Sequence, residues 1–462
     1  MHLFDTRTSS LVPVLEKRVR IYVCGITPYD FPHLGHARNA VIFDTLRRYL
    51  EFRGHEVIFV QNYTDVDDKI VARAVREGRT QKEIAERFIA EYEADLKTLN
   101  VKKPTYSPRV TENIPEIISF IEKLLEKGYA YRINGDIYFH VPSFPKYGEL
   151  SKQSLEDLNK HRIEPDPRKK DVKDFALWKS AKEEDFIAKA YFDSPWGPGR
   201  PGWHIECSVL SAKFLGIPFD IHGGGMDLIF PHHENERAQT FSLFEVEPVK
   251  IWMHNNFLTI SGEKMSKSLG NIVRIRDVVS RYGGEVLRYF LLTSHYRRVL
   301  EYSESELEKA RRAYNYLKNT LLNMDMEIAF LKTFGDRKGK SIELEKFKSE
   351  FIKALENDFN TSKAIAEIHN FANSINRELY SLDLKTLENA FETLMTFFSI
   401  LGIFENWKRI RTLNKEEIEL LKEREIFRKE RDFEKSDRIR EKFREKGLIL
   451  LDTKWGVRWR YE

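Results

Sequence analysis

The sequence predicts an α/β fold, built on a parallel sheet with helices on its faces and followed by an all-helical region. Residues 19–24 are β-branched and apolar, residues 37–53 have helical character, and residues 55–61 are strand-like. Strand, loop, helix and strand in that order form a βαβ unit, which is typical of parallel sheets. Residues 101–200 follow a different pattern of short strands and polar stretches, which indicates an insertion. From about Glu285 onward, Leu/Glu/Lys/Arg periodicity and few prolines predict helices.

Turn residues and changes of composition mark the ends of the elements. Gly25 ends the first strand, and Pro28 and Pro32 lie in the loop before the helix that Gly54 closes. The further expected elements are a charged helical region at 69–99, short strands at 129–133 and 136–141, a helix at 203–216, strands at 219–222 and 256–260, and a strand-like end at 448–461. A stretch rich in Lys, Asp and Pro at 162–173 belongs to the predicted insertion.

Composition and charge exclude several classes of protein. With 462 residues, the chain is long enough for about three or four domains. The 76 basic and 72 acidic residues give a net charge of +4, which argues against a bulk polyanion binder, so a nucleic-acid partner would need local basic surface. Neither a membrane-length apolar run nor a signal-peptide pattern is present, and we expect a cytoplasmic protein. Two distant cysteines argue against a disulfide framework.

Four residues could form a metal site. His232 and Glu236 are four positions apart, which places both side chains on one face of a helix. Cys24 ends the first strand, and Cys207 lies in the predicted helix at 203–216. Because the carboxyl ends of parallel strands converge on one crevice, distant residues can meet there, and two Cys, a His and a Glu suit zinc. Four further residues compete as ligands, and the two histidines among them could equally be structural: His222, His233, Glu206 and Glu234.

A second group of residues could bind phosphate. His33, Gly35 and His36 lie where the loop passes into the first helix. Glycine lets a ligand approach the backbone, and a helix N-terminus attracts phosphate. Two imidazoles there could donate hydrogen bonds to the charge that develops during phosphoryl chemistry. Metal binding competes with this interpretation.

Two glycine-containing turns complete the candidate nucleotide site. The turn after the strand at 219–222 contains Gly223, Gly224, Gly225 and Asp227, whose carboxylate could bond a ribose hydroxyl. An ordinary tight turn is the alternative. A later loop carries two lysines that could bind a triphosphate, or could simply be exposed: Lys264 and Lys267.

Together these motifs resemble those of class I aminoacyl-tRNA synthetases. Residues 33–36 resemble the "HIGH" signature, and residues 264–268 match the "KMSKS" signature, in the order of that class. The stretches that resemble the cysteinyl branch in particular are residues 22–25, 62–69, 175–179, 194–208 and 223–236. Leu34 replaces the usual Ile, and Pro28 stands where Val is common, but neither touches a reacting group.

The resemblance implies a cysteine–tRNA ligase. It implies that Cys24, Cys207, His232 and Glu236 bind Zn²⁺, which holds the sulfur of the substrate L-cysteine. His33, His36, Lys264 and Lys267 would serve the phosphates of ATP with Mg²⁺, while Gly35 and residues 223–227 bind the nucleotide. Thr64 and Trp203 would contact the amino acid, although a plain core Trp is the alternative. The cysteinyl group would then pass from AMP to the 2′-hydroxyl of the terminal adenosine of tRNA.

The resemblance also implies an order of domains and a monomer. The expected parts are the first half of a Rossmann-like catalytic domain at 1–105, a connective insertion at 106–200, the second half with the KMSKS loop at 201–284, a helical stem-contact region at 285–345, a helical tRNA-binding bundle at 346–404, and a small anticodon-recognition domain at 405–462.

The chain end leaves two interpretations open. The aromatic and basic residues there could stack on anticodon bases and contact phosphates, or the tryptophans could form a small hydrophobic core: Trp455, Trp459, Arg458 and Arg460.

Two rival functions share the sequence features. A cysteine ligase of small-molecule thiol biosynthesis would need no long helical region, and a non-catalytic tRNA-binding paralogue would not need both signatures intact.

Overall fold

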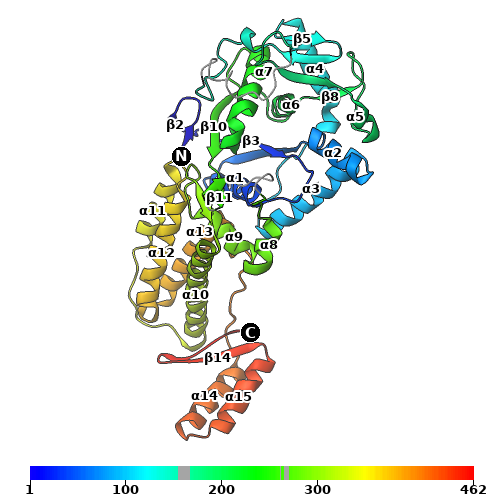
Figure 1. The fold of residues 1–462 in the computed structure, drawn as a ribbon. Helices are drawn as coiled ribbons and strands as arrows, with labels where there is room; N and C mark the ends of the chain where they lie inside the picture. Colours follow the sequence, from blue (N-terminus) through cyan, green and yellow to red (C-terminus); the bar gives the residue numbers. More distant parts are fainter. Residues whose placement is uncertain (154–166, 261, 265–269) are drawn as a thin grey trace. The chain divides into compact units, whose positions relative to one another are not determined.

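The structure is a computed structural model that describes residues 1–153, 167–260, 262–264 and 270–462 (Figure 1). The chain divides into two compact units. The first comprises residues Met1–Leu307 and Leu355–Thr361, and the second comprises Glu308–Ala354 and Ser362–Glu462. No helix of the described part is long and apolar enough to cross a bilayer.

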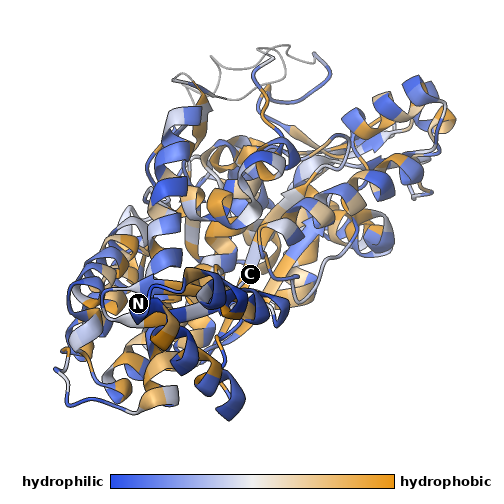
Figure 2. Cartoon of the chain, turned by 90° about the horizontal axis from the view of Figure 1, so that it is seen from below, coloured by the Kyte–Doolittle hydropathy of each residue, from blue (hydrophilic) through white to orange (hydrophobic). Residues whose placement is uncertain are grey.

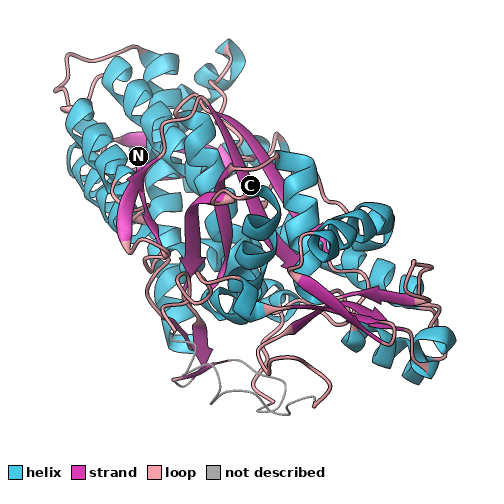
Figure 3. Ribbon diagram, turned by 90° about the horizontal axis from the view of Figure 1, so that it is seen from above, coloured by secondary structure: helices cyan, strands magenta, loops and turns pink. Residues whose placement is uncertain are grey.

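A four-stranded parallel sheet, in the order β10-β9-β3-β4, forms the centre of the first unit. Its strands are β3 (Arg18–Ile26), β4 (Glu56–Tyr63), β9 (Phe219–Gly225) and β10 (Val249–Asn255). Helices lie beside the magenta strands in Figure 3. The sheet confirms the predicted α/β fold, and the expected βαβ unit is β3, α1 (Leu34–Phe52) and β4.

Helices α1 and α6 (Trp203–Leu215) pack against the strands of this sheet. The other helices of this part of the unit are α2 (Asp68–Glu77), α3 (Gln81–Thr98), α4 (Ile114–Glu126), α7 (Glu234–Phe244), α8 (Ile275–Tyr282) and α9 (Gly284–Leu292). A hairpin of β1 (His2–Asp5) and β2 (Ser10–Pro13) begins the chain. A short sheet of β11 (Leu258–Ile260), β12 (Glu263–Lys264) and β13 (Leu300–Tyr302) follows β10.

The predicted insertion contains a separate antiparallel sheet in the order β5-β6-β7-β8. Its elements are β5 (Ala130–Ile133), β6 (Asp136–Phe139), β7 (Phe175–Ser180), α5 (Glu183–Ile187) and β8 (Gly199–Pro201). The first part of the polar stretch expected at 162–173 lies outside the described residues, which resume at residue 167.

The second unit is helical, as predicted, and ends in a hairpin. Its helices are α10 (Glu304–Phe334), which begins in the first unit, α11 (Leu344–Glu356), α12 (Thr361–Glu378), α13 (Leu384–Leu401), α14 (Lys415–Lys429) and α15 (Phe433–Glu445). The strands β14 (Leu448–Thr453) and β15 (Gly456–Tyr461) pair antiparallel. Figure 2 shows helices that are hydrophilic along some faces and hydrophobic along others, the pattern of amphipathic helices packed on a core.

Candidate functional site

The candidate site lies where the parallel strands end. Val23 of β3 is paired with Gly223 of β9, and Gly225 at the end of β9 is paired with Asn255 at the end of β10. The three strand ends open into a cavity of about 410 Å³. Ligands of open α/β sheets bind outside the carboxyl ends of the strands, which is where this cavity lies.

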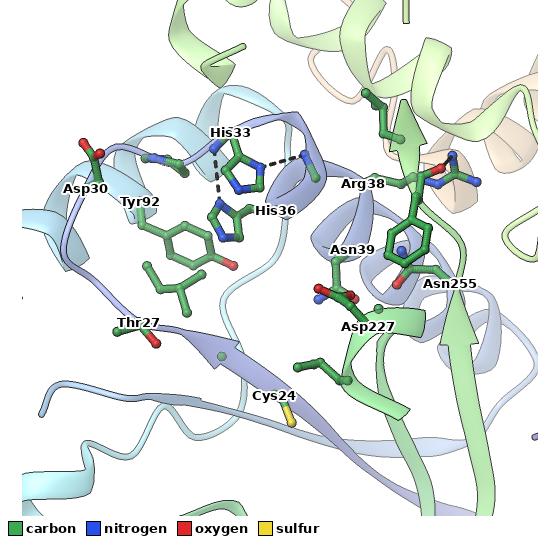
Figure 4. A pocket seen from close by; sticks show the side chains of 18 of the residues that line it. Cys24, Thr27, Asp30, His33, His36, Arg38, Asn39, Tyr92, Asp227 and Asn255 are labelled. Carbon is green, nitrogen blue, oxygen red and sulfur yellow. Dashed lines mark hydrogen bonds between the residues drawn. The ribbon is translucent and has the colours of Figure 1, made fainter. Parts of the chain in front are cut away.

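A close backbone contact shapes the end of β3. The amide of Gly25 donates to Asn62 Oδ1 over 2.9 Å. A Cβ atom on Gly25 would lie 1.5 Å from the carbonyl oxygen of Asn62, so no residue with a side chain fits there. Glycine at this position lets Cys24 stand at the pocket edge beside β4 (Figure 4).

The structure brings the four predicted metal ligands together. Cys24 comes from β3, Cys207 from α6, His232 from the turn Ile229–His233, and Glu236 from α7. One ligand atom from each lies within 4.8 Å of the others. All four residues are buried, and Cys24 Sγ lies 3.8 Å from Cys207 Sγ.

The donor set fits a zinc ion. His232 Nε2 lies 3.0 Å from Glu236 Oε1, yet it makes no well-formed hydrogen bond to any described residue. A buried imidazole beside two thiol sulfurs and a carboxylate has the composition of a metal site. Two cysteines, a histidine and a glutamate match the donors that zinc prefers.

A second set of donors overlaps the first. Cys24 and Glu236 also lie within 4.8 Å of ligand atoms of His222 and His233. His233 Nε2 is 3.2 Å from Cys24 Sγ, and His222 Nε2 is 2.8 Å from Glu236 Oε2. The other two competing candidates, Glu206 and Glu234, join no such group within the described ranges.

Two further histidines, which the sequence motifs did not indicate as site residues, contact the outer ring nitrogens of the cluster. His204 Nδ1 lies 2.9 Å from His232 Nδ1, and His254 Nε2 lies 2.7 Å from His233 Nδ1. A hydrogen bond to the outer nitrogen fixes the orientation of a metal-binding imidazole. A signal for His204 was present, because it precedes Cys207 by three residues and therefore shares its helix face.

Burial and close charges shift the protonation equilibria of the cluster. Burial would raise the pKa of Glu236, but the imidazoles of His222 and His232 lower it to about 2. Burial would lower the pKa of His232, but Glu236 and Cys207 raise it to about 10. Burial would raise the pKa of the Cys207 thiol, but the neighbouring Cys24 and His232 bring it down to about 6. A thiolate and a carboxylate therefore lie close together, as a divalent cation requires.

Of the two predicted substrate contacts, Trp203 lines the cavity and Thr64 does not. Trp203 is 39% exposed and lines the cavity, with its ring centroid 4.2 Å from that of His232. Thr64 is 2% exposed, and its hydroxyl accepts a hydrogen bond from Asn62. Thr64 also bonds the buried Glu206, whose pKa is raised well above its usual value by burial.

The two signature histidines form the start of α1. His33 caps the helix, its Nδ1 accepting from the amide of Gly35 over 3.1 Å, while His36 Nδ1 accepts from the amide of His33 over 3.2 Å. Their rings stack with centroids 3.8 Å apart, and both side chains line the cavity (Figure 4). Because each Nδ1 accepts, the proton of each neutral ring is on Nε2.

The glycine-rich turn serves two purposes. Gly225 and Asp227 line the cavity. Gly223 and Gly224 are buried, and a Cβ atom would lie 2.3 Å from the ring of Phe43 at the first and 2.9 Å from the ring of His233 at the second. These two glycines let α1 and the histidine cluster pack closely against β9. Their predicted contact with the nucleotide stays a prediction.

The predicted lysines are only partly within the described structure. Lys264 lies in β12, where it is paired with Thr259 of β11. Lys267 lies outside the described residues.

The burial of residues in the hairpin of β14 and β15 contradicts part of the predicted anticodon contact. Trp459 is 0% exposed within a small core of the second unit, so for this residue the small hydrophobic core is confirmed and the stacking interpretation is wrong. Arg458 is also buried and binds Glu327 over 2.6 Å. Trp455, in contrast, is 50% exposed and stacks on Tyr380 with centroids 5.4 Å apart.

Comparison with family models identifies two regions. Residues 10–312 match the model described as the tRNA synthetases class I (C) catalytic domain, and residues 350–405 match the DALR domain. Solved structures share the fold at low identity. A Mycobacterium tuberculosis methionyl-tRNA synthetase in complex with methionyl-adenylate is 15% identical with a TM-score of 0.59, covering 84% of this chain and 90% of that chain. An Agrobacterium radiobacter leucyl enzyme, solved with tRNA, has a TM-score of 0.62 at 11% identity, covering 83% and 84% of the two chains.

Curated relatives match along nearly the whole length. A cysteine–tRNA ligase of Archaeoglobus fulgidus is 64% identical over 96% of this chain and 96% of its own. One from Thermococcus gammatolerans is 47% identical, covering 97% and 96% of the two chains. Both the sequence signatures and the parallel-sheet cavity agree with these matches. The chain belongs to the cysteine–tRNA ligase family of class I aminoacyl-tRNA synthetases.

Proposed function

We propose that the protein activates L-cysteine with ATP at the cavity, using a zinc ion to select the substrate's sulfur, and then esterifies the terminal adenosine of tRNA. The observation that carries the proposal is the buried group of Cys24, Cys207, His232 and Glu236 at the edge of the cavity that His33 and His36 also line. In this proposal the enzyme acts as a cytoplasmic monomer.

Selection of cysteine is assigned to the cluster. Zinc bound there would offer the substrate thiolate a bond that a serine hydroxyl or an alanine methyl does not match. Discrimination of this kind is usually large, so the proposal needs no editing step. Trp203, against the ring of His232, would cover the amino-acid side chain. Thr64, which does not line the cavity, would act through its contacts with Asn62 and Glu206.

Activation is assigned to the residues at the start of α1 and in the two turns. The substrate carboxylate would attack the α-phosphate and displace pyrophosphate, while His33 and His36 donate hydrogen bonds from Nε2 to the phosphate oxygens. Gly35 lets the triphosphate approach the N-terminus of the helix. Lys264 and Lys267, together with Mg²⁺, would neutralise the triphosphate, and Asp227 would bind the ribose. Because this chemistry needs positioning and charge stabilisation, no covalent enzyme intermediate is proposed.

One experiment tests the proposal as a whole. Purified protein should contain zinc and should catalyse cysteine-dependent ATP–pyrophosphate exchange. It should then charge tRNA and should form no amide with an amino sugar, the product of the rival ligase. Exchange without charging would point to the rival, and a protein with neither activity would match the non-catalytic paralogue.

Removal of the hydrogen bond behind His232 should weaken the metal site. His204→Phe keeps a ring against Phe175, whose centroid is 5.5 Å from that of His204, but removes the nitrogen that meets His232. Zinc affinity should fall by about 10- to 100-fold, as is typical when an outer partner of a ligand is lost. Competition with a chromophoric chelator measures this affinity. Unchanged affinity would show that His204 does not support the ligand.

Truncation of Trp455 should weaken tRNA binding without affecting activation of the amino acid. The Trp455 ring stacks on Tyr380, and Lys454 Nζ lies 5.1 Å from it, an arrangement suited to an unpaired base. For Trp455→Ala, we expect kcat/KM for tRNA to fall by about 5- to 100-fold, the cost of one stacked base. Exchange measured without tRNA should stay unchanged. Trp455→Phe, which keeps an aromatic face, is the matched control, and wild-type charging by the alanine variant would contradict the assignment.

A further inference from the structure

We propose that Lys69 and Arg274 bind phosphates of the single-stranded 3′ end of tRNA as the terminal adenosine enters the cavity. This inference rests on the proposed function, because it assigns residues to the third reactant, after L-cysteine and ATP. The two side chains then serve the binding of tRNA and the transfer step, and activation of cysteine does not depend on them.

Lys69 and Arg274 are cations without a counter-charge. Lys69 is the second residue of α2, Arg274 directly precedes α8, and both residues are exposed. In the described part of the chain, no carboxylate pairs with either of them. Arg276, only two residues after Arg274, binds Glu91 over 2.6 Å. Two charges that the protein leaves unneutralised attract an anion from outside.

Each of the two cations lies over an aromatic ring at the cavity. Lys69 Nζ is 5.4 Å from the centroid of the Tyr29 ring, and the guanidinium carbon of Arg274 is 4.9 Å from the centroid of the Phe31 ring. Tyr29 and Phe31 belong to the loop between β3 and α1, and both line the cavity, as Lys69 does. The face of a ring holds a cation in position while its N–H groups stay available to an anion.

Backbone contacts place Arg274 beside the start of α1, because it forms an antiparallel bridge with His33. Figure 4 shows Asp30 of the aromatic loop on the same side of the cavity as His33, with Asp227 on another side. The carboxylate of Asp30 is paired with Arg73 over 3.4 Å, so it repels an incoming anion less. Since the proposed function assigns Asp227 to ATP, the aromatic loop borders a side of the cavity that cysteine and the ribose leave open.

The third reactant has the charge that these two cations require. The terminal adenosine reaches the cavity at the end of a single strand, which carries one negative charge at each phosphodiester. Proteins hold such strands with cations along the backbone and with aromatic side chains. The triphosphate of ATP is the competing anion, but in the proposed function it lies within the cavity against His33, His36 and Lys264. Exposed cations at the edge of the cavity match a strand that enters from outside.

The test compares two steps of the reaction in a variant of each cation. Lys69→Gln and Arg274→Gln should each lower kcat/KM for tRNA by about 10-fold, the effect of losing one charge-assisted hydrogen bond. Each should also reduce the steepness of log kcat/KM against log salt concentration by about 0.7, the value for one contact to a single strand. Cysteine-dependent ATP–pyrophosphate exchange without tRNA should match the wild type. Lys69→Arg, which keeps the charge, should recover most of the loss.

The matched control is Lys179→Gln. Lys179 is a nearby cation that is paired with Asp68 over 2.8 Å, so its loss should change neither step. A tRNA with neutral methylphosphonates in place of its last two phosphodiesters should be charged more slowly by the wild type, and the variants Lys69→Gln and Arg274→Gln should add little to that loss. An undiminished effect of these variants on the neutral tRNA would overturn the inference. A parallel loss of exchange would overturn it too, because the cations would then serve ATP.

Binding measured without catalysis separates this inference from the proposed function. Fluorescence anisotropy compares labelled tRNA with the same tRNA lacking its last three nucleotides. Lys69→Gln and Arg274→Gln should bind the intact tRNA more weakly than the wild type does and should bind the shortened tRNA equally well. Equal weakening for both RNAs, or weakening for neither, would overturn the inference. A protein that distinguishes the two RNAs in this way but activates no cysteine would contradict only the proposed function.

Discussion

Replacing Cys207 with serine should remove zinc and cysteine-dependent exchange together. Cys207 is 1% exposed and shares the cluster with Cys24, so its loss takes away one of two sulfur ligands. A serine hydroxyl stays protonated where the thiol of Cys207, with a pKa of about 6, ionises. Zinc affinity should fall by more than the ~100-fold that loss of an outer partner can cause. Elemental analysis after dialysis measures the metal, and the exchange assay measures activation.

Because two donor sets overlap at Cys24 and Glu236, a second variant can show which of the two sets holds the metal. Cys207 and His232 belong to one set, and His222 and His233 belong to the other. His222→Phe keeps the ring that stacks on Trp252, 4.7 Å between centroids, and removes only the bond to Glu236. This variant should retain zinc at saturating metal, while Cys207→Ser should not. The reverse result would place the ion in the second set, and full exchange by metal-free protein would remove zinc from the mechanism.

The architecture of the catalytic half was predictable because local signals agree with it. The apolar strand before Gly25 became β3, the helix expected at 37–53 became α1, and the strand expected at 55–61 became β4. Their order alone indicates parallel pairing. Helix ends moved by a few residues, since α1 begins at Leu34, where His33 accepts from the backbone as its cap. Histidine is not a usual cap, and the sequence pattern gave no reason to extend the helix to it.

The residue types of the candidate metal site could be predicted from the sequence, but their arrangement in space could be predicted only in part. Spacing placed His232 and Glu236 on one face, but it could not exclude the competing ligands, which were His222, His233, Glu206 and Glu234. That decision depends on how α6 and α7 pack against the strand ends, which long-range contacts determine. Packing also distinguishes Trp455 from Trp459, which are four residues apart in the hairpin of β14 and β15. Trp455 lies at the exposed tip of the hairpin, and Trp459 lies in the buried part of β15. Burial of this kind depends on the partner surface, which local sequence does not contain.

The structure also separates the two tasks of the cavity. Cys24 and Trp203 mark the end where the sulfur of cysteine would be held, and His33 and His36 mark the end where the phosphates would lie. In the proposed function, the zinc cluster would govern which amino acid is accepted, and the start of α1 would govern how fast it is activated. A variant at α1 should consequently reduce rate without changing the preference for cysteine over serine.

His36→Asn should slow adenylate formation while leaving the helix start intact. The asparagine Oδ1 occupies nearly the position of Nδ1, so it can still accept from the amide of His33, a bond of 3.2 Å in the wild type. The Nε2–H that would reach the phosphate is lost. Removal of one donor from a developing oxyanion usually costs about 100- to 1,000-fold in kcat. We expect a loss of that size in single-turnover adenylate formation, with an unchanged melting temperature and an unchanged zinc content.

His36→Gln is the matched control, because the glutamine amide reaches the position of Nε2 but not that of Nδ1. If phosphate contact is the role of His36, glutamine should recover part of the rate that asparagine loses, despite the missing bond to the amide of His33. If capping of α1 is the role, the order reverses, with asparagine active and glutamine both slow and less stable. The cysteine-to-serine preference should match the wild type in both variants, since the cluster around Cys24 is untouched. A change in that preference would mean that the two ends of the cavity are coupled, against the separation that the geometry indicates.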